Sequence, residues 1–315
     1  MTTLADYYAS AGLFVPEFAE AITLRFPPFK HQIGDLAHLA KFTRSSLLSE
    51  PGTGKTLPAH GYGLWLAGQG NKVVYTMPPM LTTQFYKSLA STYPGYEQFV
   101  SCAILQGPPK ERSKLIDSWQ GQWPDMLIMS YRMFVGYHEQ LKDAQGYTCV
   151  IVDEANAVKN PGSLLHKSVK IFGGDHQHAS NGIVLMTGSP IDTNLTDAYG
   201  LIALVTPGSY GSKRNFDRVH CLFNPYSPYP QILAYIRHDL LHYNLFLQGR
   251  RVKKADVSDL PPRLISEIPI TLNRSHRQLY ARIVEDRLAE IGDRVLDLTE
   301  QPTPRCRLSE NYCIR

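Results

Sequence analysis

A glycine-rich run of five residues has the composition of a phosphate-binding loop; it consists of Gly52, Thr53, Gly54, Lys55 and Thr56. Glycines allow backbone N–H groups to turn toward a polyphosphate at the positive end of a helix. A lysine supplies a cation for the β and γ oxygens, and the adjacent hydroxyl can bind Mg²⁺. The strict pattern has glycine where this chain has Ser49. A phosphate loop remains the better interpretation than a chance match, because the run lies between an expected strand and an expected helix.

Two adjacent carboxylates, Asp153 and Glu154, follow an apolar run at residues 149–152. An aspartate at the carboxyl end of a buried strand can hold Mg²⁺, and a neighbouring glutamate can orient or deprotonate the attacking water. This adjacency indicates hydrolysis of a nucleoside triphosphate rather than transfer to a small acceptor. An ordinary acidic helix N-terminus is the alternative. The lysine of the phosphate loop lies 98 residues earlier, so two halves of one site agree.

Two hydroxyl residues, Thr187 and Ser189, follow another apolar run at 183–186. The carboxyl ends of parallel strands border the ligand crevice, so these hydroxyls could sense the γ-phosphate. Taken alone, a Thr-Gly-Ser-Pro segment is more often only a turn.

Short apolar runs must position these residues, and they lie at 46–48, 73–76, 100–105, 126–129, 148–152 and 183–186. Each is bounded by Gly, Pro or polar residues, which is typical of strands covered on both faces. Helical patterns lie between them, for example at 80–92 and 109–119. The fold class is therefore α/β with a mostly parallel sheet. No strand pattern is evident within 209–250; a strand at 264–271 and a helix at about 275–291 are expected beyond it.

The composition is that of an ordinary soluble protein: 315 residues, 43% hydrophobic and 19% charged. It excludes a collagenous or wholly disordered chain. No apolar run approaches the ~18 residues of a membrane-spanning helix, and no positive charge precedes Arg25, so neither a membrane span nor a secretory signal is expected. Five cysteines without a C-x-x-C pair favour a reduced cytosolic protein.

The net charge of +4 is concentrated in one segment. Residues 209–263 carry nine basic and four acidic side chains, whereas residues 1–208 carry 15 and 16. This indicates an anionic partner for residues 209–263, with a solvated helical surface as the alternative.

The order of the motifs resembles the Swi–Snf-type ATPases of helicase superfamily 2, which are double-stranded-DNA translocases and remodelers. The resemblance is carried by residues 28–32, 49–56, 76–85, 125–131, 153–163, 187–194, 207–216, 250–263 and 278–280. It implies a RecA-like three-layer fold that binds ATP and Mg²⁺, with Gln32 reading adenine and Thr56 and Asp153 on the metal. It also implies contacts to the DNA backbone, and the candidate residues are Thr76, Pro78, Ser130, Tyr131, Arg250, Arg251 and Lys253.

Three departures from that family's pattern matter. Asn156 stands where His or Gln is usual, which predicts altered coupling between the segments at 153–156 and 187–194. Ser189 replaces a threonine and keeps its hydroxyl. No Q-x-x-G-R-x-x-R motif is present, and nothing after residue 292 could form a second lobe. The arginine finger, which can contribute ~10³–10⁵ in rate, is therefore expected to be absent from this chain.

We therefore expect an N-terminal lead-in at 1–25, a RecA-like ATP-binding lobe at 26–208, a basic helical protrusion at 209–262 and a lead-in to a missing second lobe at 263–315. The expected function is the first lobe of an ATP-driven motor on double-stranded DNA, with single-stranded DNA and RNA less favoured as partners. Lys55, Asp153 and Glu154 are the expected catalytic residues. The protein is expected to be a monomer. Its expected location is the cytoplasm, in association with the nucleoid in a prokaryote or phage, or the nucleus in a eukaryote.

Two other classes of protein compete with this interpretation. A non-catalytic nucleotide- or DNA-binding regulatory module is the alternative, favoured by the missing lobe. A phosphate-loop kinase or GTPase is disfavoured because no Asn-Lys-x-Asp motif is present.

Overall fold

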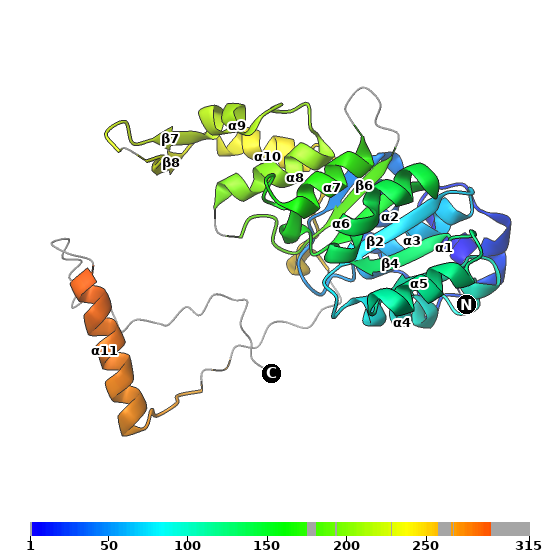
Figure 1. Ribbon diagram of the computed structural model, residues 1–315, viewed down its shortest axis with the longest axis horizontal. Coiled ribbons are helices and arrows are strands. Elements are labelled where there is room, and N and C mark those ends of the chain that lie inside the picture. Colours follow the sequence, from blue (N-terminus) through cyan, green and yellow to red (C-terminus); the bar gives the residue numbers. More distant parts are fainter. Residues whose placement is uncertain are drawn as a thin grey trace. The chain divides into compact units, whose positions relative to one another are not determined.

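The computed structural model describes residues 2–174, 181–192, 194–227, 229–257, 266 and 268–290. The chain divides into two compact units, residues 1–260 and 261–315. In the first unit a parallel sheet of seven strands has the order β3–β4–β2–β5–β6–β1–β9, with helices on both faces (Figure 1). Its strands are β1 (Arg44–Leu47), β2 (Lys72–Met77), β3 (Cys102–Leu105), β4 (Met126–Ser130), β5 (Tyr147–Asp153), β6 (Gly182–Met186) and β9 (Gly249–Arg250). The α/β class and all six expected strands are confirmed.

Helices connect the strands in the alternation that a parallel sheet requires. The α-helices of the first unit are α1 (Leu4–Ser10), α2 (Lys30–Lys41), α3 (Thr56–Ala67), α4 (Thr82–Thr92), α5 (Pro109–Ser118), α6 (Tyr131–Glu139), α7 (Leu164–Gly173), α8 (Ala198–Val205), α9 (Lys213–His220) and α10 (His238–Phe246). Short 3-10 helices lie at Glu17–Ala21, Tyr96–Gln98, Ala155–Val158, Leu195–Asp197 and Lys254–Asp256, and a π-helix at Gln140–Ala144 follows α6.

Alternate residues of each strand supply two separate cores, one on each face of the sheet. Val73, Tyr75 and Met77 of β2 pack against α1 to α4, whereas Val74 joins the core under α6 and α7. The N-terminal 25 residues belong to the first of these cores, because Leu4 is fully buried and a β-bridge joins Thr3 to Thr23. The structure thus differs from the expected boundary at residue 26, since these residues are part of the lobe.

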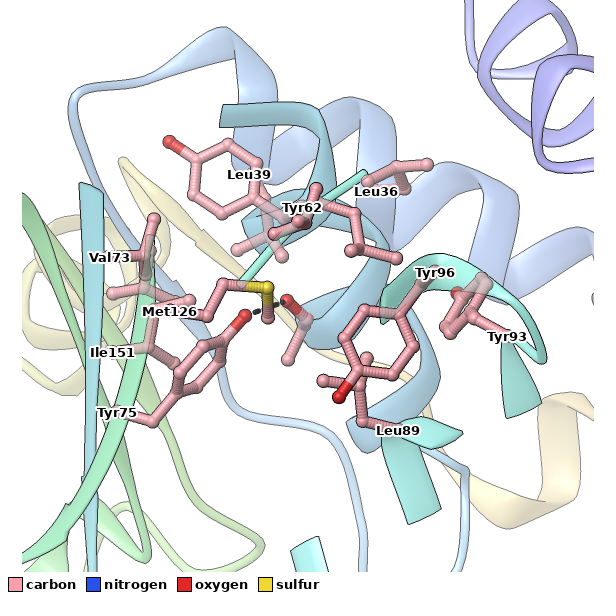
Figure 2. Close-up of a cluster of buried hydrophobic side chains, with 14 of the residues drawn as sticks. Leu36, Leu39, Tyr62, Val73, Tyr75, Leu89, Tyr93, Tyr96, Met126 and Ile151 are labelled. Carbon is pink, nitrogen blue, oxygen red and sulfur yellow. Dashed lines mark hydrogen bonds between the residues drawn. The ribbon is translucent and has the colours of Figure 1, made fainter. Parts of the chain in front are cut away.

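Tyr75 joins β2 to the helix that follows the phosphate loop. Its hydroxyl donates to the carbonyl of Ala59 in α3 at 3.0 Å, the dashed line in Figure 2. Gly63 lies against the same hydroxyl, so a side chain at position 63 would overlap with Tyr75. This close approach places α3 directly on the sheet and sets the position of its N-terminus.

His60, also in α3, is a buried titratable group in the same core. Its side chain is 0% exposed, and the Phe85 ring lies 4.2 Å away, centroid to centroid. Burial lowers the pKa of His60 from 6.5 to about 3. Only the neutral imidazole is therefore compatible with the folded state at ordinary pH.

We predict that folding stability falls as pH drops below 6.5, because the unfolded chain binds a proton that the folded chain excludes. By linkage, the loss is about 2 kcal/mol at pH 5 and is absent above pH 7. The measurement is the free energy of unfolding in urea between pH 5 and pH 7.5, for the wild type and His60→Leu. The variant should show a flatter dependence; an unchanged slope between pH 5 and 6.5 would contradict the prediction.

The segment from residue 209 onward contains strands that were not expected. A two-stranded antiparallel hairpin, β7 (Cys221–Phe223) and β8 (Ile232–Tyr235), follows α9. A third cluster of buried side chains joins α8, α9 and α10, with Phe216 and Leu241 near its centre, and includes Leu48 beyond β1. The interpretation of 209–250 as lacking strands was therefore wrong: three-residue and four-residue strands are too short to show a pattern.

Residues 248–254, called the return segment below, come back to the sheet after α10. Within it, β9 pairs in parallel with β1, Ser46 opposite Gly249 and Leu47 opposite Arg250. The structure therefore differs from the protrusion expected at 209–262, because residues 249–250 within that range form an edge strand of the lobe's sheet.

In the second unit, the expected helix is confirmed as α11 (Arg274–Glu290). The prediction of a strand at 264–271 is wrong for residues 266 and 268–271, because these residues form no strand. Residues 264, 265, 267 and 291–315 lie outside the described residues, as do the Leu-Pro-Pro-Arg residues at 260–263.

Candidate functional site

The three polar segments predicted from the sequence meet at the carboxyl edge of the sheet. Strands β5, β6 and β1 are neighbours in that order. The acids end β5, Thr187 follows β6, and the phosphate loop follows β1. Thr187 donates its backbone N–H to the carbonyl of Leu47 at 3.1 Å, which ties two of these strand ends together. Residues up to 140 positions apart thus share one edge, which sequence spacing alone could only suggest.

The phosphate loop has the backbone that its glycines predict. Gly52 and Gly54 have φ values of +84° and +78°, a region open to glycine but strained for other residues. The N–H groups of Gly52, Gly54 and Lys55 find no acceptor among the described residues. The ammonium of Lys55 donates to the carbonyls of Ser49 at 2.7 Å and Glu50 at 3.2 Å. Free N–H groups around a glycine turn, with a lysine inside it, form a cradle for a polyphosphate.

The charges at this edge are coupled. Burial raises the pKa of Asp153 to about 6 and repulsion by Glu154 adds to the shift, while the N–H of Glu154 and the charge of Lys55 oppose it. Burial lowers the pKa of Lys55, and Glu154 and Asp153 oppose that shift. A cation beside Asp153 would favour its ionised form. Mg²⁺ binds through one or two carboxylates together with substrate phosphates, so the donor set fits that ion. Among the described residues, no group of three or more His, Cys, Asp or Glu forms a metal cage of its own.

The backbone of the acidic pair is held by Tyr131. Glu154 has a φ of +50°, which is uncommon for a residue other than glycine. The Tyr131 hydroxyl donates to the carbonyl of Glu154 at 3.0 Å and also to that of Asp153. Tyr131 therefore braces the candidate catalytic acids in this structure, a role that sequence reasoning missed.

Asn156 connects the acidic segment to the hydroxyls after β6. Its side-chain amide donates to Ser189 Oγ at 2.9 Å, and its carbonyl oxygen accepts from Thr187 Oγ1 at 3.1 Å. The two departures noted in the sequence, Asn156 and Ser189, thus contact each other. The two segments are linked through an amide, and Gly188 between the hydroxyls packs on Pro51 of the phosphate loop.

Gln32 lies behind the phosphate loop rather than in open solvent. It is 5% exposed, and its amide donates to the carbonyl of Gly54 at 3.2 Å. A ring nitrogen of His31 lies 2.8 Å from the carbonyl of Thr53. The Gln32 side-chain carbonyl also accepts the N–H of Phe29 at 2.9 Å, so the start of α2 supports the loop, and the reading of adenine by Gln32 stays a prediction.

The residues expected to contact DNA differ in their exposure and in their contacts within the lobe. Thr76 is fully buried, so its side chain does not reach the surface. Pro78 follows β2 and Ser130 is the last residue of β4, and both are half-buried. Arg251 and Lys253 are exposed and form no ion pair within the described ranges. Arg250, in contrast, donates its Nε to Asp35 at 2.7 Å.

These features define the class: a RecA-like nucleotide-binding lobe with a phosphate loop, an acidic pair and a hydroxyl segment on neighbouring strands. The SNF2-related domain matches residues 67–302, so the chain belongs to that family. At the level of the family it is a Swi–Snf-type ATPase domain, for which nucleotide binding is implied and Mg²⁺ is usual. The described residues contain no helix long and apolar enough to cross a membrane.

Named relatives agree with this assignment. The chain is 26% identical over 226 residues to the TATA-binding protein-associated factor mot1 of Aspergillus fumigatus, covering 69% of this chain and 11% of the relative. It is 24% identical over 250 residues to the ISWI chromatin-remodeling complex ATPase of Saccharomyces cerevisiae, covering 78% and 21%. For an uncharacterized ATP-dependent helicase of Mycoplasma genitalium the identity is 25% over 248 residues, covering 78% and 22%. The chain thus spans less than a quarter of each relative's length.

A solved structure shows the same fold. The SWI2/SNF2 ATPase core of Sulfolobus solfataricus, in complex with double-stranded DNA, superposes with a TM-score of 0.56 at 19% identity. The match covers 88% of this chain and 55% of that one. At this identity the likeness concerns the fold.

Proposed function

We propose that this chain is the ATP-binding first lobe of a motor on double-stranded DNA, which hydrolyses ATP when a second RecA-like lobe completes the site. The observation that carries the proposal is the meeting of Lys55 with Asp153 and Glu154 at one edge of the sheet, with electrostatic coupling among the three.

Each residue has a chemical task in this proposal. The free N–H groups of the loop and the Lys55 ammonium bind the β and γ oxygens. Thr56 and Asp153 hold Mg²⁺, which when bound offsets the negative charge of the phosphates. Glu154 orients a water molecule and accepts its proton, and the Tyr131 hydroxyl holds the backbone that carries that carboxylate. Asn156 transmits the position of the acids to Thr187 and Ser189.

DNA binding rests on the surface beyond the strand ends. Pro78 and Ser130 lie next to the site, and Arg251 and Lys253 are available cations. The structural neighbour is itself a complex with double-stranded DNA. Contacts of this type bind the phosphate backbone and weaken as salt concentration rises.

The experiment that tests the proposal is ATP binding by the 315-residue chain. We expect weak binding that requires Mg²⁺ and falls at least about tenfold in Lys55→Ala, because a charge-assisted contact is removed. Lys87→Ala, an exposed lysine of α4, is the control and should bind as the wild type does. Equal affinities in Lys55→Ala and the wild type would overturn the proposal.

Turnover separates the motor lobe from a non-catalytic module. We expect little hydrolysis by this chain alone, even with duplex DNA, because the arginine finger is expected to come from elsewhere. DNA-stimulated hydrolysis that Lys55→Ala abolishes would show that the arginine finger is supplied from elsewhere, for example by a neighbouring protomer. ATP binding without any effect of duplex DNA on affinity or turnover would favour the regulatory module.

A further inference from the structure

The return segment runs alongside β1 and then continues to the phosphate loop. Three N–H groups along β1 and the loop, those of Ser46, Leu48 and Glu50, donate to the carbonyls of Gln248, Arg250 and Val252 at 3.0, 2.7 and 3.0 Å. The pairing therefore extends past the end of the strand. Residues 202 positions apart in sequence are held in register at the mouth of the nucleotide cradle.

Two side chains of the loop fasten this contact from the other direction. Ser49 Oγ accepts the N–H of Val252 at 3.0 Å, and both residues are buried. Glu50 Oε2 accepts the N–H of Lys254 at 2.9 Å. A glycine at position 49, as the strict phosphate-loop pattern requires, could not make the first of these bonds. Ser49, which stands where the strict pattern has glycine, thus bonds the return segment to the phosphate loop.

The side chain of Lys254 extends over the glycine turn of the loop. A Cβ at Gly52 would lie 3.5 Å from Lys254 Cε and 3.8 Å from its Nζ. Lys254 is exposed, and in the part of the chain that the structure describes its ammonium forms no ion pair. The Lys55 ammonium instead lies on two loop carbonyls. Two cations therefore flank one glycine turn, and neither forms an ion pair among the described residues.

We propose that Lys254 is a second phosphate-binding cation of the nucleotide site, delivered by the return segment and positioned through Ser49 and Glu50. This inference rests on the proposed function, since it assumes that the cradle binds a triphosphate. The ligand class is a polyphosphate of at least two phosphates. Lys55 and Lys254 flank the same glycine turn, so each cation would contact a phosphate held there. Binding then ties the return segment, which leads toward α11, to the occupied loop.

The test is the affinity of Mg·ATP and of inorganic tripolyphosphate, measured by calorimetry on the whole chain. Lys254→Gln should weaken both by about tenfold, as expected for losing one charge-assisted contact. Lys254→Arg keeps the charge and should retain most of the affinity. Lys87→Gln is the matched lysine control. The melting temperature of Lys254→Gln should equal that of the wild type, since the exposed ammonium supports no other described group.

Hydrogen exchange of residues 250–254 gives an independent readout. Mg·ATP should slow exchange in this segment of the wild type, and the slowing should be lost in Lys254→Gln. Ser49→Gly should speed exchange at Val252 even without nucleotide, because its acceptor is gone. Wild-type affinity in Lys254→Gln, together with loss of binding in Lys55→Ala, would overturn this inference alone. If the wild type binds neither ATP nor tripolyphosphate, the proposed function fails as well.

Discussion

Arg250→Ala is expected to lower the free energy of unfolding by about 2–3 kcal/mol, the cost of leaving a buried carboxylate without its cation. Asp35, in α2, is 1% exposed, and Arg250 is the cation that contacts it. Burial raises the pKa of Asp35 and the Arg250 guanidinium opposes that shift. The figure is at the lower end of the range for buried pairs because Arg250 itself is 37% exposed. Gly34 leaves the space that the guanidinium occupies, so its position is well defined.

Urea unfolding of three variants checks this result. Arg251→Ala is the matched control, because the neighbouring arginine is exposed and should change stability by less than ~0.5 kcal/mol. The double variant Arg250→Ala/Asp35→Asn should be more stable than Arg250→Ala alone, since an amide costs less to bury than an unpaired charge. Equal losses in Arg250→Ala and Arg251→Ala would show that the ion pair contributes nothing, and would return Arg250 to the group of DNA-binding candidates.

Gly200→Ala is the second substitution with a large expected effect, a destabilisation of about 2 kcal/mol or more through overpacking. Gly200 lies in α8 and is buried against the backbone of Lys159, so a Cβ there would overlap with the Lys159 carbonyl group. Backbone atoms cannot rotate away as a flexible side chain can. The Lys159 ammonium bridges Asp192 and Asp197 at 3.1 and 3.2 Å, so a shift of Lys159 also disturbs the segment after β6.

The measurement is the midpoint of thermal or urea unfolding, with Gly208→Ala as the control. Gly208 is exposed, and a Cβ there would meet nothing within 4 Å. Alanine also has the higher helix propensity, so in α8 it would stabilise the protein by up to ~1 kcal/mol if it met no obstacle. A stability equal to or above that of the wild type in Gly200→Ala would contradict the close contact.

Much of the lobe was predictable because its signals are local. Strands β4, β5 and β6 of the sheet interior are short, mainly apolar runs, such as Met126–Ser130, and both faces of the sheet are covered. Such runs are recognisable without knowing what packs on them. The glycines at 52 and 54 likewise predict a backbone conformation that other residues adopt only with strain. Short strands with polar or aromatic neighbours, such as Cys221–Phe223, carry no comparable pattern.

The candidate site also contains residues that the sequence could predict and residues that it could not. The catalytic roles of Lys55, Asp153 and Glu154 were predicted from residue types and order and stay predictions, and the structure brings the three residues to one edge of the sheet. The roles of Arg250, Lys254 and Tyr131 could not be predicted from the sequence, because each depends on a partner far away in the chain. Arg250 resembled any other member of a basic segment until Asp35, 215 residues earlier, was found beside it. Charge alone indicates attraction to anions, but not whether the anion is inside the protein or outside it.

The sequence by itself thus determined the class of this protein: an α/β nucleotide-binding lobe, its phosphate loop, its acidic pair and its family. These follow from periodicity and from motif order, which are properties of the chain. Only the tertiary structure decided that the return segment closes the sheet beside β1 and that Ser49 fastens it to the loop. It also decided which basic side chains are occupied inside the lobe and which remain available. The reason is physical: an edge strand as short as Gly249–Arg250 is stabilised by the strand beside it, and nothing in its own residues records that neighbour.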